Sequence, residues 1–344
     1  MSDGDGAPGD RLRERADQSR VKLWLLMEAD RWLVVALLVV VVLAVLLAAG
    51  YLYPGAAAAV RTGDSVDTAF QGLLTATITG VTLVLTLNQL VLSQELGAVD
   101  DQRERMEGAM EFRRDVAEVV GAPVSPSRPA QFLRALVQVS GERAATFREA
   151  VGDADDDLAR ATRELTDSLV ENADRVSEGL DDATFGSFDV LSAALNFNYS
   201  WKVFAARRIR ERHGDALDEG ARQSLDDLVD ALRLFGPARE HFKTLYFQWD
   251  LINLSRRILA AAVPALLVAA VMVLYFDSGR YSVTVAGVDT LAALLAVAAT
   301  VSLLPFLVLL AYVMRIATVT KHTLSIGPFI LRETDKVAEV EWEE

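Results

Sequence analysis

Eight hydroxyl and amide side chains recur every three or four residues inside one uncharged segment of membrane length. They are Thr68, Gln71, Thr75, Thr79, Thr82, Thr86, Gln89 and Ser93, called the polar stripe below. Because an α-helix repeats about every 3.6 residues, this spacing places all of them on one face of a helix, and the same interval extended outward reaches Asp64. An amide in hydrocarbon needs a hydrogen-bonding partner. We therefore expect this face to meet water or another protein surface rather than lipid.

The sequence of the polar stripe has two interpretations. Small hydroxyl side chains let helices approach closely and exchange hydrogen bonds of roughly 0.6 kcal/mol each, which would make the stripe a helix–helix seam. Copies of the same helix around an axis would instead stack rings that line a pore. The pore-lining residues are then Thr75, Thr79, Thr82, Thr86, Gln89 and Ser93. Asp64 would lie near the outer mouth of such a pore and Asp100 near its inner mouth.

Four windows without Asp, Glu, Lys or Arg are long enough to cross about 30 Å of hydrocarbon, which needs roughly 20 helical residues. They cover residues 32–60, 68–94, 258–276 and 290–314. The first is too long for the apolar core of a signal peptide, and no small-residue cleavage site precedes a soluble domain. The sequence therefore predicts an all-α polytopic membrane protein with four transmembrane helices in two pairs.

Basic residues beside the four windows indicate the orientation, because short cytoplasmic loops carry an excess of Lys and Arg. The two short connections contain one base each, Arg61 and Arg280, whereas 18 bases flank the opposite ends of the windows. Both termini and the long middle segment are therefore expected to be cytoplasmic. This distribution predicts a multi-pass protein of the cell (plasma) membrane.

The windows divide the chain into five segments. Residues 1–31 form a cytoplasmic N-terminal segment, 32–94 transmembrane helices one and two, 95–257 a cytoplasmic helical domain, 258–314 transmembrane helices three and four, and 315–344 an acidic cytoplasmic tail. Hydrophobic periodicity and Gly or Pro breaks predict helices within the middle segment. These helices cover residues 96–120, continuing the second span, then 130–151, 158–180, 187–213, 216–235, and a last one from 238 that runs into the third span.

The composition is acidic and free of cysteine. Asp and Glu number 48 against 34 Lys and Arg, and only five of the bases are Lys. Such an acidic surface resembles the proteins of salt-loving archaea, where net charge helps to keep proteins soluble, although a GC-rich genome by itself also favours Ala, Arg, Asp and Val. The absence of cysteine excludes disulfides and thiolate sites, and an acidic membrane chain is not expected to bind nucleic acid.

No motif indicates catalysis, a metal or a cofactor. Asp153, Asp155, Asp157 and Glu164 match a calcium loop in part, but Leu158 occupies the position where that loop requires glycine, so we interpret these acids as a helix cap. The three histidines match no metal-binding spacing. We therefore expect no enzyme, although an active site assembled from distant Asp and Glu would leave no local motif.

The two-plus-two layout with a helical cytoplasmic domain between the pairs resembles the bestrophin-type chloride channels, which are pentamers lined by their second span. This resemblance is one of architecture across the whole chain and involves no residue motif. The pore of that family narrows at large apolar and aromatic side chains, whereas the second span here is rich in hydroxyls, so no site residue carries over. The chain also resembles uncharacterised four-span membrane proteins of haloarchaea.

Together these features predict a homo-oligomeric, ion-conducting pore in a lipid bilayer, lined by the Thr-rich second span. The alternative is a membrane-anchored scaffold or sensor whose cytoplasmic helices bind a protein partner. A closed ring of four or more copies favours the pore, and a monomer or dimer favours the scaffold.

Overall fold

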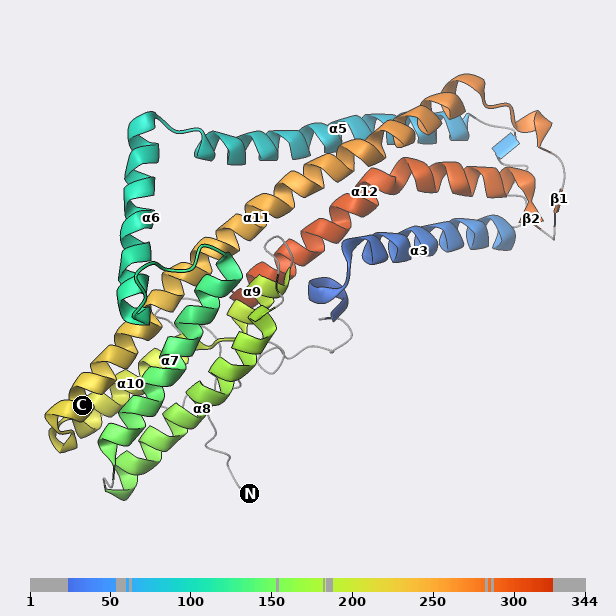
Figure 1. Cartoon of the computed structure of the whole chain (residues 1–344). Coiled ribbons are helices and arrows are strands. Elements are labelled where there is room, and N and C mark those ends of the chain that lie inside the picture. Colours follow the sequence, from blue (N-terminus) through green and yellow to red (C-terminus); the bar gives the residue numbers. More distant parts are fainter. Residues whose placement is uncertain are drawn as a thin grey trace, which may run out of the picture. The chain divides into compact units, whose positions relative to one another are not determined.

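The chain is almost entirely helical in its computed structural model (Figure 1), which describes residues 24–53, 60–61, 64–152, 155–181, 183, 188–281, 284–285 and 288–323. Two strands of two residues each, Thr284–Val285 (β1) and Val288–Asp289 (β2), pair antiparallel. The predicted all-α class is confirmed apart from this small hairpin.

Four helices are long and apolar enough to cross a membrane, as the four windows predicted. They are α3 (Arg31–Leu52), α5 (Ser65–Glu95), α11 (Glu219–Tyr275) and α12 (Thr290–Thr323). Side-chain caps mark the start of two of them, because the first backbone N–H groups of a helix lack intrahelical partners. The N–H of Trp32 donates to Asp30 Oδ1 at 2.7 Å, and that of Leu291 donates to Asp289 Oδ1 at 2.9 Å.

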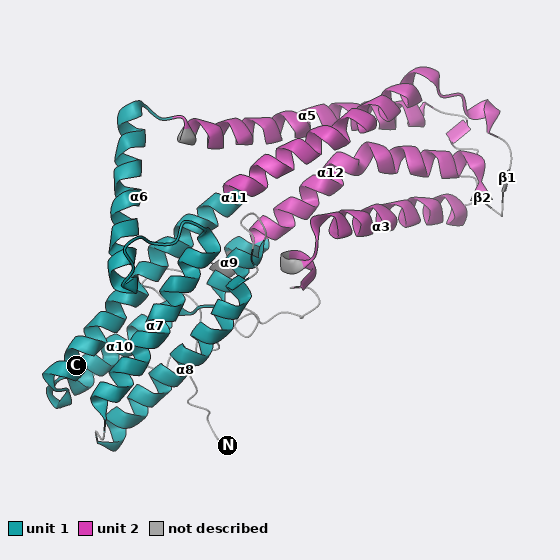
Figure 2. Cartoon of the chain, viewed as in Figure 1, with its two compact units in different colours: residues 1–23, 97–247, 318–344 teal, residues 24–96, 248–317 magenta. Residues whose placement is uncertain are grey.

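The described residues fall into two compact units (Figure 2). Among the described residues, unit 1 contains 97–247 and 318–323, and unit 2 contains 24–96 and 248–317. The long helix α11 contributes its first part to unit 1 and its second part to unit 2.

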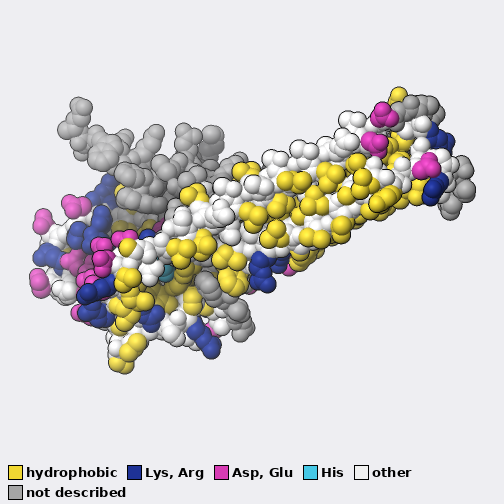
Figure 3. All heavy atoms as spheres, turned by 90° about the horizontal axis from the view of Figure 1, so that it is seen from above, with side chains coloured by type: hydrophobic (Ala, Val, Ile, Leu, Met, Phe, Trp, Pro, Cys, Tyr) yellow, Lys and Arg dark blue, Asp and Glu magenta, His cyan; other side chains and the backbone are white. Residues whose placement is uncertain are grey.

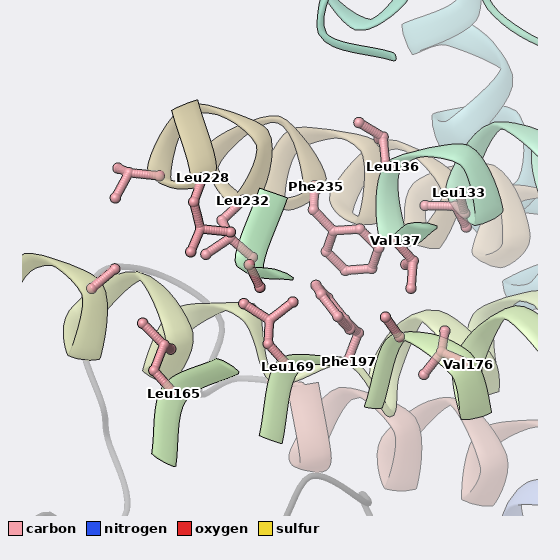
Figure 4. Packing of buried hydrophobic residues seen from close by; sticks show 14 of the residues in the cluster. Leu133, Leu136, Val137, Leu165, Leu169, Val176, Phe197, Leu228, Leu232 and Phe235 are labelled. Carbon is pink, nitrogen blue, oxygen red and sulfur yellow. The ribbon is translucent and has the colours of Figure 1, made fainter. Parts of the chain in front are cut away.

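Unit 1 is a bundle of helices around one hydrophobic core. Its helices are α6 (Val99–Val120), α7 (Pro129–Val151), α8 (Asp156–Asp181), α9 (Phe188–Leu195), α10 (Tyr199–His213), a short 3₁₀ turn (Gly214–Ala216) and the first part of α11. Figure 4 shows Val137 of α7, Leu169 of α8 and Phe235 of α11 around Phe197, and Leu136 of α7 belongs to the same core. The rings of Phe197 and Phe235 lie 4.7 Å apart between centroids, in an edge-to-face arrangement that aromatic pairs prefer.

The helix predicted over residues 158–180 from hydrophobic periodicity is confirmed as α8. Leu158, Leu165, Leu169, Ala173, Val176 and Leu180 are all buried in the core of unit 1. The helix itself extends only one or two residues beyond the predicted range at each end. Local periodicity was sufficient here because one apolar face per helix is what a bundle core requires.

Unit 2 combines α3, α5, the greater part of α12 and the second part of α11. Val35, Val84, Ile258 and Tyr312 form part of one buried cluster. A second cluster contains Phe70, Ala269, Met272 and Ala298. Large apolar side chains such as Val40, Leu83 and Leu267 remain exposed along these helices, and Figure 3 shows hydrophobic side chains as a continuous cover over a long stretch of surface. Such a surface is typical of helices that contact lipid.

The expected continuation of the second span into a charged helix is wrong. Helix α5 ends at Glu95, and α6 begins at Val99 after a break at Leu96, Gly97 and Ala98. Glycine disfavours helix by about 1 kcal/mol relative to Ala, which weakens continuation through Gly97. Asp100 and Asp101 occupy the first turn of α6, where carboxylates are stabilised by the positive end of the helix dipole.

The helix expected over residues 187–213 is two helices. α9 ends at Leu195 and α10 begins at Tyr199, with Asn198 as the residue preceding the first turn. The backbone carbonyl of Asn196 in this break accepts a 2.9 Å hydrogen bond from Nδ2 of the buried Asn172. The break also places Phe197 in the core, so tertiary contacts compensate for the interrupted helix.

The stop expected at Gly236 and Pro237 is also wrong, because α11 runs through both residues without a break. Phe235 and Ala238 on either side are buried in the core of unit 1. Gly236 lies against the ring of Tyr199, where a Cβ atom would come within 2.9 Å of the Tyr199 Oη. Packing of this segment therefore outweighs the cost of proline inside the helix.

Candidate functional site: the polar face of α5

Helix α5 positions the whole polar stripe on one uninterrupted element of 31 residues. From Thr68 to Ser93 the chain contains no charged residue, and α5 as a whole contains no Lys or Arg. The prediction that these eight side chains share one helix face is confirmed by this geometry.

Hydroxyl groups of the stripe are hydrogen-bonded within α5 itself. The Oγ1 atoms of Thr75, Thr79, Thr82 and Thr86 each donate to the carbonyl oxygen four residues earlier, at 2.8–3.0 Å. Ser93 Oγ donates to the carbonyl oxygen of Leu90 at 2.7 Å. These hydroxyl protons are therefore satisfied without a second helix, as Ser and Thr permit in helices.

The packed face of α5 lies opposite the polar stripe. Among the described side chains of this helix, the buried ones are Val66, Phe70, Thr77 and Val84. At about 100° per residue they cluster on the side away from the stripe. All eight stripe residues are exposed in the single chain. The stripe is therefore not a seam between the described helices of one chain.

A groove lies along one side of the stripe and is lined in part by its Thr68, Gln71, Thr75 and Thr79. Gly72, Ala76 and Gly80 recur every four residues along it, and Phe306 of α12 lies beside them. The groove has a volume of about 700 Å³. A Cβ atom at Gly80 would lie 3.3 Å from the Phe306 ring, whereas one at Gly72 would meet nothing within 4 Å. Small residues at this spacing permit close approach of another helix, and their four-residue repeat is already visible in the sequence.

The two acidic residues assigned to the pore mouths lie on different elements. Asp64 is the residue that precedes the first turn of α5; it is exposed, and its side chain makes no capping hydrogen bond. Asp100 is exposed in the first turn of α6 and belongs to unit 1. Asp64 therefore lies at the start of α5 on the face of the stripe, whereas Asp100 lies on another helix.

The full sequence, residues 1–344, matches a family described as a family of unknown function, DUF7972. The chain belongs to the DUF7972 family. No curated protein and no solved structure matches it. The family description assigns no function, and four helices of this chain are long and apolar enough to cross a membrane.

Buried charges gather in unit 2 where α3 begins. Arg31 forms an ion pair with Asp250 of α11, and both side chains are largely buried. Arg315 of α12 donates to the carbonyl oxygen of Ala29. These contacts connect α3, α11 and α12 through buried charged side chains. Burying such a charge away from water is costly unless it is paired and hydrogen-bonded.

Aromatic rings complete this charged cluster. The guanidinium of Arg31 lies 4.7 Å from the centroid of the Tyr312 ring, and that of Arg257 lies 5.1 Å from the Trp32 ring. Sequence reasoning counted these arginines only as flanking positive charges. It missed Asp250 as the ion-pair partner, although an acid close to the third window and surrounded by bases was the available signal.

Metal binding finds no support among the residues that the structure describes. None of their His, Asp and Glu side chains form a group of three or more suited to an ion. Asp153 of the partial calcium-loop match lies outside the described residues. Asp155 accepts a 2.8 Å hydrogen bond from the N–H of Leu158 at the start of α8, as the helix-cap interpretation predicted.

Proposed function

We propose that this protein is an oligomeric ion channel of the cell membrane whose pore is lined by the polar stripe of α5. The observation that carries the proposal is the exposure of the stripe on a helix that packs through its opposite face. Gln71 and Gln89 would leave amide groups in hydrocarbon if this face met lipid, at a cost of several kcal/mol each. A water-filled axis between copies of the chain hydrates these amides.

The surfaces on both sides of the stripe support an arrangement around an axis. Exposed apolar side chains flank it, with Ile78, Leu85 and Leu92 on one side and Leu83, Leu87 and Leu90 on the other. The groove along Gly72, Ala76 and Gly80 lies on the second side. Neighbouring copies in a ring contact one another through such flanks while the stripe faces the axis.

The proposed topology follows from the positive-inside bias. α3, α5, the second part of α11, and α12 cross the bilayer as two pairs, with unit 1 and both termini in the cytoplasm. This layout is the one that resembles bestrophin-type channels. The acidic, lysine-poor composition supports a haloarchaeal origin.

A second candidate is a membrane-anchored scaffold or sensor, and helix α6 supports it. Every residue from Val99 to Glu111 is exposed, including Met106 and Met110. Methionines on an open helix face adapt to varied partners. In this alternative, unit 1 binds a cytoplasmic protein through α6, and the polar stripe conducts nothing.

Oligomeric state and conductance together separate the two candidates. The full chain is purified in detergent, its copies are counted by native mass spectrometry and particle images, and the same sample is reconstituted into planar bilayers. A closed ring of four or more copies that carries current supports the channel. A folded monomer or dimer without current across a range of voltage, calcium and salt contradicts it and favours the scaffold.

A further inference from the structure

We propose that the pore formed by α5 conducts cations in preference to anions. This inference rests on the proposed channel and specifies which ions use it. It derives from the direction of the stripe's hydrogen bonds and from the sign of the charges on α5, neither of which the channel proposal itself requires.

The hydroxyl groups of the stripe present acceptors to the axis. A hydroxyl has one proton to donate and two lone pairs that accept. In Thr75, Thr79, Thr82 and Thr86 the proton is used in the bond to the carbonyl four residues earlier, and in Ser93 in the bond to Leu90. What these residues offer outward is therefore oxygen lone pairs, which replace the hydration of a cation.

An anion would need the opposite arrangement. Chloride is stabilised by donors, and these hydroxyls supply one only when the bond within α5 is broken. Gln71 and Gln89 carry both donors and acceptors, so they do not discriminate between the two signs of charge. The succession of hydroxyls between these amides, from Thr75 to Thr86, is the part of the stripe that discriminates.

Charges on α5 act in the same direction. The ionisable residues in its sequence are Asp67 and Glu95, both acids. Asp64 precedes the first turn on the face of the stripe and is exposed. One copy of Asp64 per subunit forms a ring of carboxylates at the outer entrance, and such rings favour cations in channels.

The nearest base on the outer side is engaged elsewhere. Arg61 Nη2 donates to the carbonyl oxygen of Tyr281 at 2.7 Å and lies 3.6 Å from Asp289 Oδ2. Its charge is thus partly balanced by Asp289 in the connection between α11 and α12. The charged side chain on the face of the stripe at this end of α5 is therefore that of Asp64.

The test is a reversal-potential measurement on the reconstituted full chain under a tenfold KCl gradient. We expect K⁺ permeability roughly tenfold above that of Cl⁻, a ratio that corresponds to about 1.4 kcal/mol and that places the reversal potential between zero and the potassium equilibrium potential, closer to the latter. Asp64→Asn should lower this ratio several-fold. Asp67→Asn, one turn further and off the face of the stripe, should lower it less.

A second pair of variants isolates the hydroxyl lone pairs. Thr82→Val keeps the shape of the side chain and replaces the oxygen by a methyl group, so K⁺ conductance and the permeability ratio should both fall. Thr77→Val makes the same change on the buried face of α5 and should leave both unchanged. Circular dichroism and particle images confirm that each variant is folded and assembled before it is measured.

Each remaining outcome has one meaning. A wild-type reversal potential near the chloride equilibrium potential overturns cation preference and leaves the channel in place. A K⁺ preference that neither Asp64→Asn nor Thr82→Val changes overturns its assignment to this face. A folded, assembled protein that carries no current overturns the channel, and the present inference with it.

Discussion

Arg31 and Asp250 form a buried ion pair that joins the first turn of α3 to α11, two elements far apart in the sequence. The side chains are 14% and 2% exposed. The ring of Tyr312 from α12 lies under the same guanidinium, so three of the four long helices meet at this pair. A buried pair of this kind contributes little net stability, but it makes either partner costly to remove alone.

Removal of the Asp250 carboxylate should therefore destabilise the protein. We expect Asp250→Ala to lower the free energy of unfolding by about 3–5 kcal/mol, because it leaves the Arg31 guanidinium buried without its counter-charge. The double variant Arg31→Met/Asp250→Leu should recover most of this loss. Thermal unfolding of the purified protein in detergent, followed by intrinsic fluorescence, measures both changes.

An exposed ion pair provides the control. Arg103 and Glu107 of α6 form an i,i+4 pair whose side chains are 77% and 64% exposed. Glu107→Ala should change the free energy of unfolding by no more than about 0.5 kcal/mol. A loss in Asp250→Ala as small as that of Glu107→Ala would contradict the structural role assigned to the buried pair.

Lysine substitutions on α5 test which face is wet. We expect Thr82→Lys to assemble and to shift the permeability ratio of the channel toward anions, because its charge stays hydrated in a water-filled pore. Leu83→Lys lies about 100° around the helix and should cost about 2.5–3.5 kcal/mol on insertion scales. Size-exclusion chromatography and bilayer recordings report the two effects. Equal loss of assembly in both variants would show that the stripe is a dry contact.

Two glycine-to-alanine substitutions should have effects of opposite sign. In Gly236→Ala the new methyl group meets the Tyr199 ring at about the distance where atoms clash, and overpacking of about 1–3 kcal/mol exceeds the helix gain of about 1 kcal/mol. Gly108 of α6 has no atom within 4 Å of its Cβ position, so Gly108→Ala should stabilise by about 0.5–1 kcal/mol. Denaturant unfolding monitored by circular dichroism compares them. Stabilisation in both variants would show that the Tyr199 ring moves aside freely.

The orientation can be tested by labelling single cysteines introduced into this cysteine-free chain. We expect Gly279→Cys, between α11 and α12, to react with a membrane-impermeant maleimide added to intact cells. Gly63→Cys should react as well; this position lies outside the described residues. Gln138→Cys and Glu178→Cys lie on exposed positions of unit 1 and should react only after lysis. Labelling of Gln138→Cys in intact cells would reverse the proposed topology.

The sequence determined the features that depend on neighbours along the chain. The charge-free windows identified the four long apolar helices, because length and hydrophobicity are properties of a segment by itself. The spacing of the polar stripe placed it on one face of α5, and the periodicity of α8 identified its buried side. The limits of α7 were predicted within one residue. Proline favours the first turn of a helix, where Pro129 lies, and glycine favours the position just after its end, where Gly152 lies.

Only the tertiary structure decided what these faces contact. It buried the face of α5 that contains Thr77 and exposed the face that contains Thr82; the spacing separated these two faces but did not decide which of them packs against other helices. It also carried α11 through Gly236 and Pro237, because Tyr199 packs against the glycine. The tertiary structure also paired Asp250 with Arg31, two residues that are distant in the sequence. Such choices depend on contacts between residues distant in the sequence, whose packing outweighs local propensities of about 1 kcal/mol.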